Sequence, residues 1–175
     1  MTMKLTILGS GTAIVTARRG PSGYLIKIAD KTLLLDSGSG TLRKIAEASS
    51  SFKEIDYAIY THLHPDHVTD LISLLFALRI PSNFKSKDLT VIGPAGMKEF
   101  HRNLAKVFND FIDPRGYELT INELSGGYLD LENFRLTSSL INHHEGSLAY
   151  RVKSKEGKSL VYSGDTDYCE SIVDL

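Results

Sequence analysis

The chain has 175 residues, with 20 Lys and Arg against 21 Asp and Glu and 42% hydrophobic residues. This balance excludes a disordered chain, and the net charge of −1 speaks against a general electrostatic attraction to nucleic acid or a membrane surface. The single cysteine, Cys169, excludes an intrachain disulfide framework, and no apolar run reaches the ~20 residues that span a bilayer. We therefore expect a cytoplasmic protein with a single domain over residues 1–175.

In the first part of the chain, strand patterns alternate with helical ones. Apolar runs predict strands over residues 4–8, 24–29, 32–36 and 57–60, and a glycine-rich loop covers residues 9–23. Hydrophobic spacings of three and four predict helices over residues 41–48 and 67–78. A strand over residues 89–92 then precedes a long amphipathic helix over residues 95–111.

After Pro114 the pattern changes to strands, which we expect over residues 118–121, 128–131, 134–140, 148–152 and 160–162. A last helix starts near Cys169 and runs to Leu175. Strands combined with separate long helices predict a layered α/β or α+β fold.

The segment THLHPDH, residues 61–67, contains three of the six histidines of the chain and one aspartate. In an extended segment, His62 and His64 point to the same side and can bind one metal ion together. Pro65 then turns the chain, so that Asp66 and His67, at the start of a helix, can face a second ion. Imidazole and carboxylate ligands suit zinc, and also manganese or iron. The alternative is a solvated polar loop that carries histidines by coincidence.

This His-x-His-x-Asp-His pattern after a strand resembles the metallo-β-lactamase superfamily of metallohydrolases. Further segments resemble its ribonuclease Z-like and phosphodiesterase branch: LTILGSGT at residues 5–12, LLLDSGSGT at residues 33–41, and SGDT at residues 163–166. The resemblance covers nearly the whole chain. It implies an αββα sandwich, in which two similar halves pack sheet against sheet with helices outside.

The resemblance also assigns roles to individual residues. It implies two divalent ions, bound by His62 and His64, by Asp66 and His67, and bridged by Asp165. His143 matches the next ligand of the first ion on the usual spacing of the family. Its neighbour His144 is the alternative, because neighbouring side chains on an extended segment face opposite ways. If it is not a ligand, His144 lies behind the ligands or is exposed.

Other positions allow both a structural and a functional interpretation. Asp36 either ends a turn or, as the resemblance implies, anchors the histidine loop by hydrogen bonds from behind the metal ligands. His101 is predicted to be a satisfied, partly buried histidine. Arg18 and Arg19 form either a solvated loop pair or a contact to a phosphate-bearing substrate.

The implied activity is hydrolysis by a metal-bound hydroxide, with Asp66 and Asp165 as catalytic carboxylates. The branch favours phosphodiesters as substrates, either small molecules or nucleic acid. Ribonuclease Z itself is disfavoured, because the 13 residues between Arg151 and Asp165 allow a hairpin but no RNA-gripping arm. A thioesterase- or glyoxalase-like hydrolase on the same scaffold is the alternative enzyme.

The second half of the implied fold is incomplete in this sequence. Members of the family continue past the Gly-Asp-Thr turn to a last histidine of the second metal site, which has no counterpart here. We favour a fragment over a chain completed by another chain and over a degenerate member. A catalytically incomplete metal-binding module is thus a further alternative. Exposed apolar surface predicts association, as a homo-oligomer or with a completing chain.

Overall fold

The computed structural model describes residues 3–14, 16–80 and 87–175. The strands of its larger sheet are β1 (Met3–Gly9), β2 (Gly23–Ile28), β3 (Lys31–Ser37), β4 (Tyr57–Ile59), β5 (Leu89–Pro94) and β6 (Leu119–Leu124). Those of the smaller sheet are β7 (Gly127–Leu131), β8 (Phe134–Leu140), β9 (Leu148–Ser154) and β10 (Ser159–Tyr162). The helical segments are α1 (Thr41–Glu47), η1 (Phe52–Glu54), α2 (Pro65–Val68), α3 (Asp70–Arg79), α4 (Met97–Phe108), η3 (Asn109–Ile112) and α5 (Glu170–Val173).

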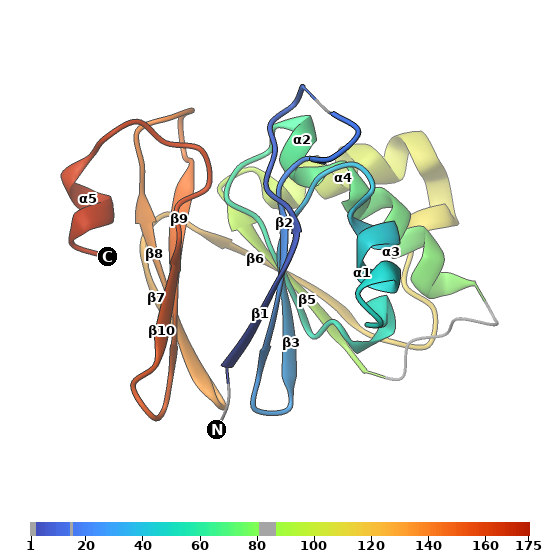
Figure 1. The fold of residues 1–175 in the computed structure, drawn as a ribbon. Helices are drawn as coiled ribbons and strands as arrows, with labels where there is room; N and C mark the ends of the chain where they lie inside the picture. The colour runs from blue at the N-terminus through green and yellow to red at the C-terminus, as the bar shows by residue number, and fades with distance from the viewer. Residues whose placement is uncertain (1–2, 15, 81–86) are drawn as a thin grey trace.

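Figure 1 shows the two sheets packed face to face, with α1, α3 and α4 on the outer side of the larger sheet. That sheet has the order β1-β2-β3-β4-β5-β6, antiparallel as far as β3 and parallel from β3 to β6. Parallel neighbours need a crossover, and these helices supply it between consecutive strands. The layered α/β fold predicted from the sequence is confirmed.

Strand β3 shows how the sequence separates two hydrophobic cores. Successive side chains of a strand point to opposite faces. Leu34 packs among the helices, whereas Leu33 and Leu35 face the smaller sheet. From that sheet, residues such as Leu136 and Tyr150 complete the core between the sheets. All of β3 after Lys31 is therefore buried, which explains its continuous apolar run.

The smaller sheet is antiparallel throughout, in the order β10-β9-β8-β7. Residues 155–158 alone connect β9 to β10, so the segment before Asp165 is the hairpin that the sequence predicts. On the outer face of this sheet, α5 packs against β8 (Figure 1). Within the described part of the chain, no helix combines the length and the apolar character needed to cross a membrane.

Two predicted helices differ from the structure. The helix expected over residues 67–78 begins earlier, at Pro65, and is divided into α2 and α3 at Thr69, whose backbone stays helical and whose hydroxyl donates to the Pro65 carbonyl. The helix expected over residues 95–111 ends at Phe108, because Asn109 has a positive φ of 51° and the chain continues as η3.

Candidate metal centre

The candidate ligands lie at one end of the sandwich, where loops from both sheets meet. His62 and His64 follow β4, Asp165 follows β10, and His143 lies in the loop between β8 and β9. Backbone and side-chain hydrogen bonds join the two sheets here. The Leu148 amide donates to the Thr61 carbonyl at 2.9 Å, and the Tyr150 hydroxyl donates to the Tyr60 carbonyl at 2.9 Å.

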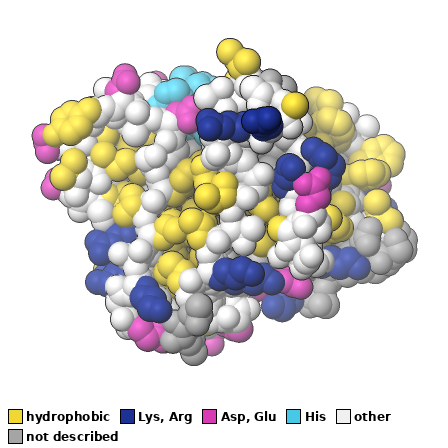
Figure 2. Space-filling model, in the orientation of Figure 1, with side chains coloured by type: hydrophobic (Ala, Val, Ile, Leu, Met, Phe, Trp, Pro, Cys, Tyr) yellow, Lys and Arg dark blue, Asp and Glu magenta, His cyan; other side chains and the backbone are white. Residues whose placement is uncertain are grey.

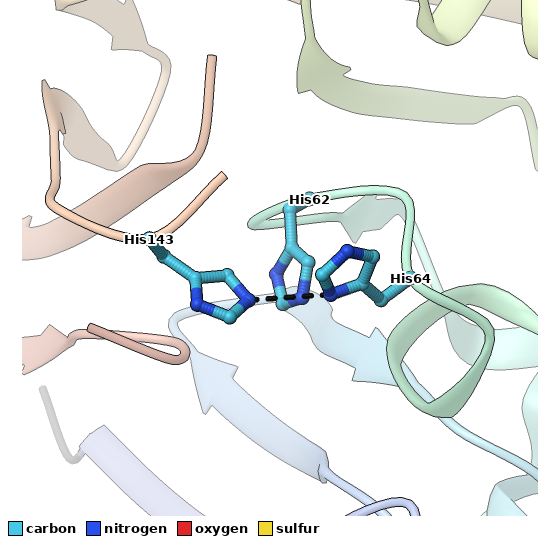
Figure 3. A group of neighbouring side chains, drawn as sticks. All are labelled: His62, His64 and His143. Atoms are coloured by element: carbon cyan, nitrogen blue, oxygen red, sulfur yellow. Dashed lines mark hydrogen bonds between the residues drawn. The ribbon is translucent and has the colours of Figure 1, made fainter. Parts of the chain in front are cut away.

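One group consists of His62, His64 and His143, whose ring nitrogens all lie within 4.8 Å of one another. Figure 3 shows the three rings turned toward one another, with His143 coming from the smaller sheet and the other two from the loop after β4. His143 Nε2 lies 3.2 Å from His64 Nδ1. The structure thus brings together the three residues predicted for the first ion.

A second group consists of His62, His67 and Asp165, again within 4.8 Å. His67 Nε2 lies 3.4 Å from Asp165 Oδ1. Asp66 lies outside both groups, although its Oδ2 is 3.7 Å from the same His67 nitrogen. The two candidate groups therefore lie side by side and overlap at the buried His62, whose one free ring nitrogen can serve either group.

His144 is exposed and lies outside both groups. Its Nδ1 is 3.1 Å from the Glu145 carbonyl, and its backbone amide donates to the Ser147 hydroxyl at 3.2 Å. The His144 ring lies beside His64, with ring centroids 5.4 Å apart, but it is His143 whose ring nitrogen joins the other ligands.

Asp36 is fully buried behind the ligands and accepts four hydrogen bonds. Its Oδ1 accepts from the Thr61 amide at 2.9 Å. Its Oδ2 accepts from the Thr61 hydroxyl at 2.8 Å, from His67 Nδ1 at 2.7 Å and from the Tyr162 hydroxyl at 2.6 Å. The carboxylate thereby ties β3, the histidine loop and β10 together at the centre.

These hydrogen bonds fix the direction in which two histidines present a lone pair. Since the Thr61 hydroxyl gives its only proton to Asp36, it accepts from His62 Nδ1, 3.0 Å away. His67 likewise donates from Nδ1 to Asp36. In the neutral form of each ring Nε2 is then the nitrogen without a proton, and it is Nε2 of His67 that faces Asp165.

The donor set fits a metal ion. His62 Nε2 is buried and has no hydrogen-bond partner among the described residues, and a lone pair in this state is costly unless something binds it. Burial, together with the neighbouring His67, lowers the pKa of His62 to about 4, so its ring is neutral at pH 7. Burial opposes protonation of His67 too, but the hydrogen bond and charge of Asp36 raise its pKa above the usual value.

Thr61 and Tyr162 belong to this arrangement but are not among the residues singled out in the sequence. Thr61 has a sequence signal, since it directly precedes the histidine motif. Tyr162 has none, because its contact with Asp36 joins residues 126 positions apart. Gly164, at a φ of 61°, also matters, because a Cβ there would lie 2.8 Å from Thr61 Cβ.

His101 and the arginine pair belong to neither ligand group. His101 Nε2 is buried without a partner among the described residues, so the prediction of a satisfied histidine is wrong in that respect. Burial lowers its pKa. Arg18 and Arg19 are exposed in the loop between β1 and β2, and both line a cavity there.

The fold and this histidine- and aspartate-rich centre define a metallo-β-lactamase-fold protein of the ribonuclease Z-like class. Solved structures share the fold. Human tRNase Z, short form, is 20% identical with a TM-score of 0.78, and the match covers 94% of this chain and 69% of that one. The metallo-β-lactamase fold protein YhfI from Bacillus subtilis is 25% identical with a TM-score of 0.79, covering 97% and 65%.

The chain belongs to the family described as "Anti-Pycsar protein Apyc1", whose model matches residues 3–175. It is also 31% identical over 159 residues to a ribonuclease Z from Clostridium acetobutylicum, covering 86% of this chain and 50% of that relative. The chain spans about half the length of most ribonuclease Z relatives that it matches. The predicted resemblance to the superfamily and to its ribonuclease Z-like branch is confirmed.

Proposed function

We propose that this chain belongs to a metal-dependent phosphodiester hydrolase with two divalent ions at the centre. His62, His64 and His143 would hold the first ion, and Asp66, His67 and Asp165 the second. Zinc suits this mixture of imidazole and carboxylate, with manganese and iron as alternatives. One observation carries the proposal: ring nitrogens from both sheets gather around His62, whose buried Nε2 has no hydrogen-bond partner among the described residues.

Bound divalent ions would lower the pKa of coordinated water and neutralise charge on the phosphoryl oxygens. The chain itself contributes orientation and proton acceptance. Asp36 holds the His67 ring with Nε2 toward Asp165. Asp165 has a half-exposed side chain and lies at the mouth of the site, where it can accept a proton from water or contact substrate. We assign the same carboxylate chemistry to Asp66.

For the substrate we propose a phosphodiester, and a small one in preference to structured RNA. The names of the ribonuclease Z relatives support the phosphodiester class. The short connection between β9 and β10 supports a small substrate, because it provides no arm to hold an RNA there. We also propose that the chain acts as an anti-Pycsar protein, as the description of its family states. We place the protein in the cytoplasm, where a free cysteine such as Cys169 stays reduced. We also assign residues 1–175 to one domain.

Elemental analysis of the purified chain tests the proposal. We expect two divalent ions per chain, a loss of about one in His143→Ala, and no loss in the neighbouring His144→Ala control. The loaded protein should hydrolyse bis(p-nitrophenyl) phosphate but no chromogenic thioester. Thioester hydrolysis in place of phosphodiester hydrolysis would assign the scaffold to a thioesterase- or glyoxalase-like enzyme. Equal metal loss in both variants would contradict the ligand assignment.

A second candidate is a metal-binding module without hydrolysis. The position of Asp66 outside both ligand groups favours it, since the second group then has only His67, Asp165 and the shared His62. This candidate predicts one ion per chain and turnover of neither chromogenic substrate.

A further inference from the structure

Two adjoining cavities with basic walls lie between the loop over residues 9–23 and α1. Their volumes are about 170 and 240 Å³. Both are lined by Arg18, Arg19 and Lys44, and Arg43 lines the first as well. We call these cavities together the basic groove.

Hydrogen bonds join the described parts of the loop that borders the groove, residues 9–14 and 16–23. The Gly11 amide donates to the Gly20 carbonyl at 2.8 Å. The Thr16 hydroxyl accepts from the backbone amides of Arg18 and Arg19 at 3.3 and 3.1 Å. A Cβ at Gly9 would lie 2.0 Å from the Pro21 carbonyl oxygen, so the two arms of the loop pack closely. Arg18 and Arg19 therefore project from a closely packed, hydrogen-bonded part of the loop.

The groove has an excess of positive charge. Arg43 and Lys44 both pair with Glu47, at 3.0 and 2.7 Å. Arg18 and Arg19 form no ion pair with any described residue, and no acidic side chain is among the described residues that line the groove. In Figure 2, Lys and Arg side chains gather on this face next to a histidine and an acidic side chain.

The basic groove lies next to the metal centre, and Pro21 and Gly38 separate the two. Pro21 lines the groove, and Gly38 packs between it and Asp66. A Cβ at Gly38 would lie 2.1 Å from the Asp66 carbonyl oxygen and 2.4 Å from Pro21 Cβ. A third cavity, of about 360 Å³, reaches Asp165 and shares Ser10 with the groove. The groove and the cavity that reaches Asp165 thus adjoin at Ser10.

We propose that the basic groove binds a phosphate group, at a site distinct from the metal centre. Guanidinium groups match the geometry of phosphate oxygens in paired hydrogen bonds, and Lys44 adds a point charge. The phosphate is either free inorganic phosphate or a second phosphate of the substrate. The second alternative, a phosphate group of the substrate, rests on the proposed function, whereas binding of free inorganic phosphate does not.

Titration of the metal-free chain with inorganic phosphate, followed by amide NMR shifts, tests the site without any hydrolysis. We expect saturable shifts of the loop glycines Gly11 and Gly20. Arg18→Ala/Arg19→Ala should weaken binding at least about tenfold, since two charge-assisted hydrogen-bonding groups are lost. The control Lys153→Ala/Lys155→Ala removes the same charge from β9 and the hairpin after it, and should bind as the wild type does. Absence of shifts, or equal weakening in both variants, would overturn the proposal.

The source of the phosphate is decided with two chromogenic substrates. These are the p-nitrophenyl ester of thymidine 5′-phosphate with and without a 3′-phosphate. If the groove receives a second phosphate of the substrate, the preference for the 3′-phosphorylated ester falls about tenfold in Arg18→Ala/Arg19→Ala and stays constant in the control. If phosphate binding is lost but the preference is constant, the groove is a site for free phosphate. The phosphate titration decides the site even if neither ester is hydrolysed.

Discussion

Asp36 organises the centre although it belongs to neither ligand group. It is fully buried at a φ of 52°, and its carboxylate accepts from Thr61, His67 and Tyr162. We expect Asp36→Asn to lower metal affinity by about 10–100-fold, because an amide cannot accept all of these bonds and the His67 ring loses its orientation. Competition with a chelator measures the affinity. Asp30→Asn, in an exposed turn, is the control, and equal affinity in the two variants would contradict this role.

Tyr162 holds Asp36 from the opposite sheet. Burial and the Asp36 charge raise the pKa of its hydroxyl well above the usual value, so it remains a donor. Tyr162→Phe should lower the free energy of unfolding by about 2 kcal/mol, the scale of a hydrogen bond to a charged group. Urea denaturation measures it. Tyr168→Phe removes an exposed hydroxyl bonded to Glu170 and should have little effect, so a similar loss in both would refute the assignment.

The buried ring of His62 makes the metal-free protein sensitive to acid. Its pKa in the folded state is about 4, below the ordinary 6.5. The unfolded chain therefore binds more protons between these values, and the free energy of unfolding falls as the pH falls from 6.5 to 4. His67, with its raised pKa, acts in the opposite sense and loses its contribution as the pH rises.

Denaturation of metal-free protein across this pH range isolates the effect. We expect His62→Gln to flatten the profile between pH 6.5 and 4, whereas the exposed control His144→Gln should follow the wild type. A His62→Gln profile as steep as that of the wild type would assign the acid sensitivity to other groups.

At the scale of the elements, the loop after β3 packs closely against α2. An alanine at Gly38 would place Cβ 2.1 Å from the Asp66 carbonyl oxygen, where backbone must move. We expect Gly38→Ala to lower the free energy of unfolding by about 1–3 kcal/mol and to reduce metal content, because Asp66 and His67 are displaced. Gly20→Ala, with nothing within 4 Å of the added carbon, is the control. If the two variants have the same metal content by elemental analysis and the same free energy of unfolding in urea, this prediction is wrong.

Much of the arrangement of elements could be predicted because periodicity is local. The strand expected over residues 134–140 is β8 as observed, and its alternating burial follows from its residues. The division between α2 and α3 could not be predicted, because apolar spacing continues across it and Thr69 keeps helical backbone angles. Apolar periodicity therefore predicts that a helix is present but does not fix its boundaries.

The same distinction holds for the centre. Four candidate ligands are neighbours in sequence, and the motif locates them at a strand end. The convergence of His143 with His64, 79 positions apart, came from resemblance, since no local pattern fixes such a distance. The contact between Tyr162 and Asp36 was indicated neither by a local sequence pattern nor by the resemblance to the family.

At the scale of the whole molecule, the edges of both sheets leave apolar side chains in solvent. β1 and β10 are edge strands, and Leu5 and Val161 line the same cavity between them. Ile7 is 63% exposed and Val161 46% exposed. Figure 2 shows hydrophobic side chains gathered on this face. Unpaired edges that carry apolar side chains favour association with another chain.

We therefore expect the chain to self-associate through these edges. Sedimentation velocity should show concentration-dependent oligomers that Ile7→Lys/Val161→Lys shifts toward monomer, because charge on an edge opposes pairing. The control Val107→Lys/Val173→Lys adds the same charge at positions that are 70% and 66% exposed on α4 and α5, and should associate as the wild type does. If the control dissociates the oligomer instead, the helical surfaces form the contact. If the wild type is monomeric at all concentrations, the exposed edges do not drive association.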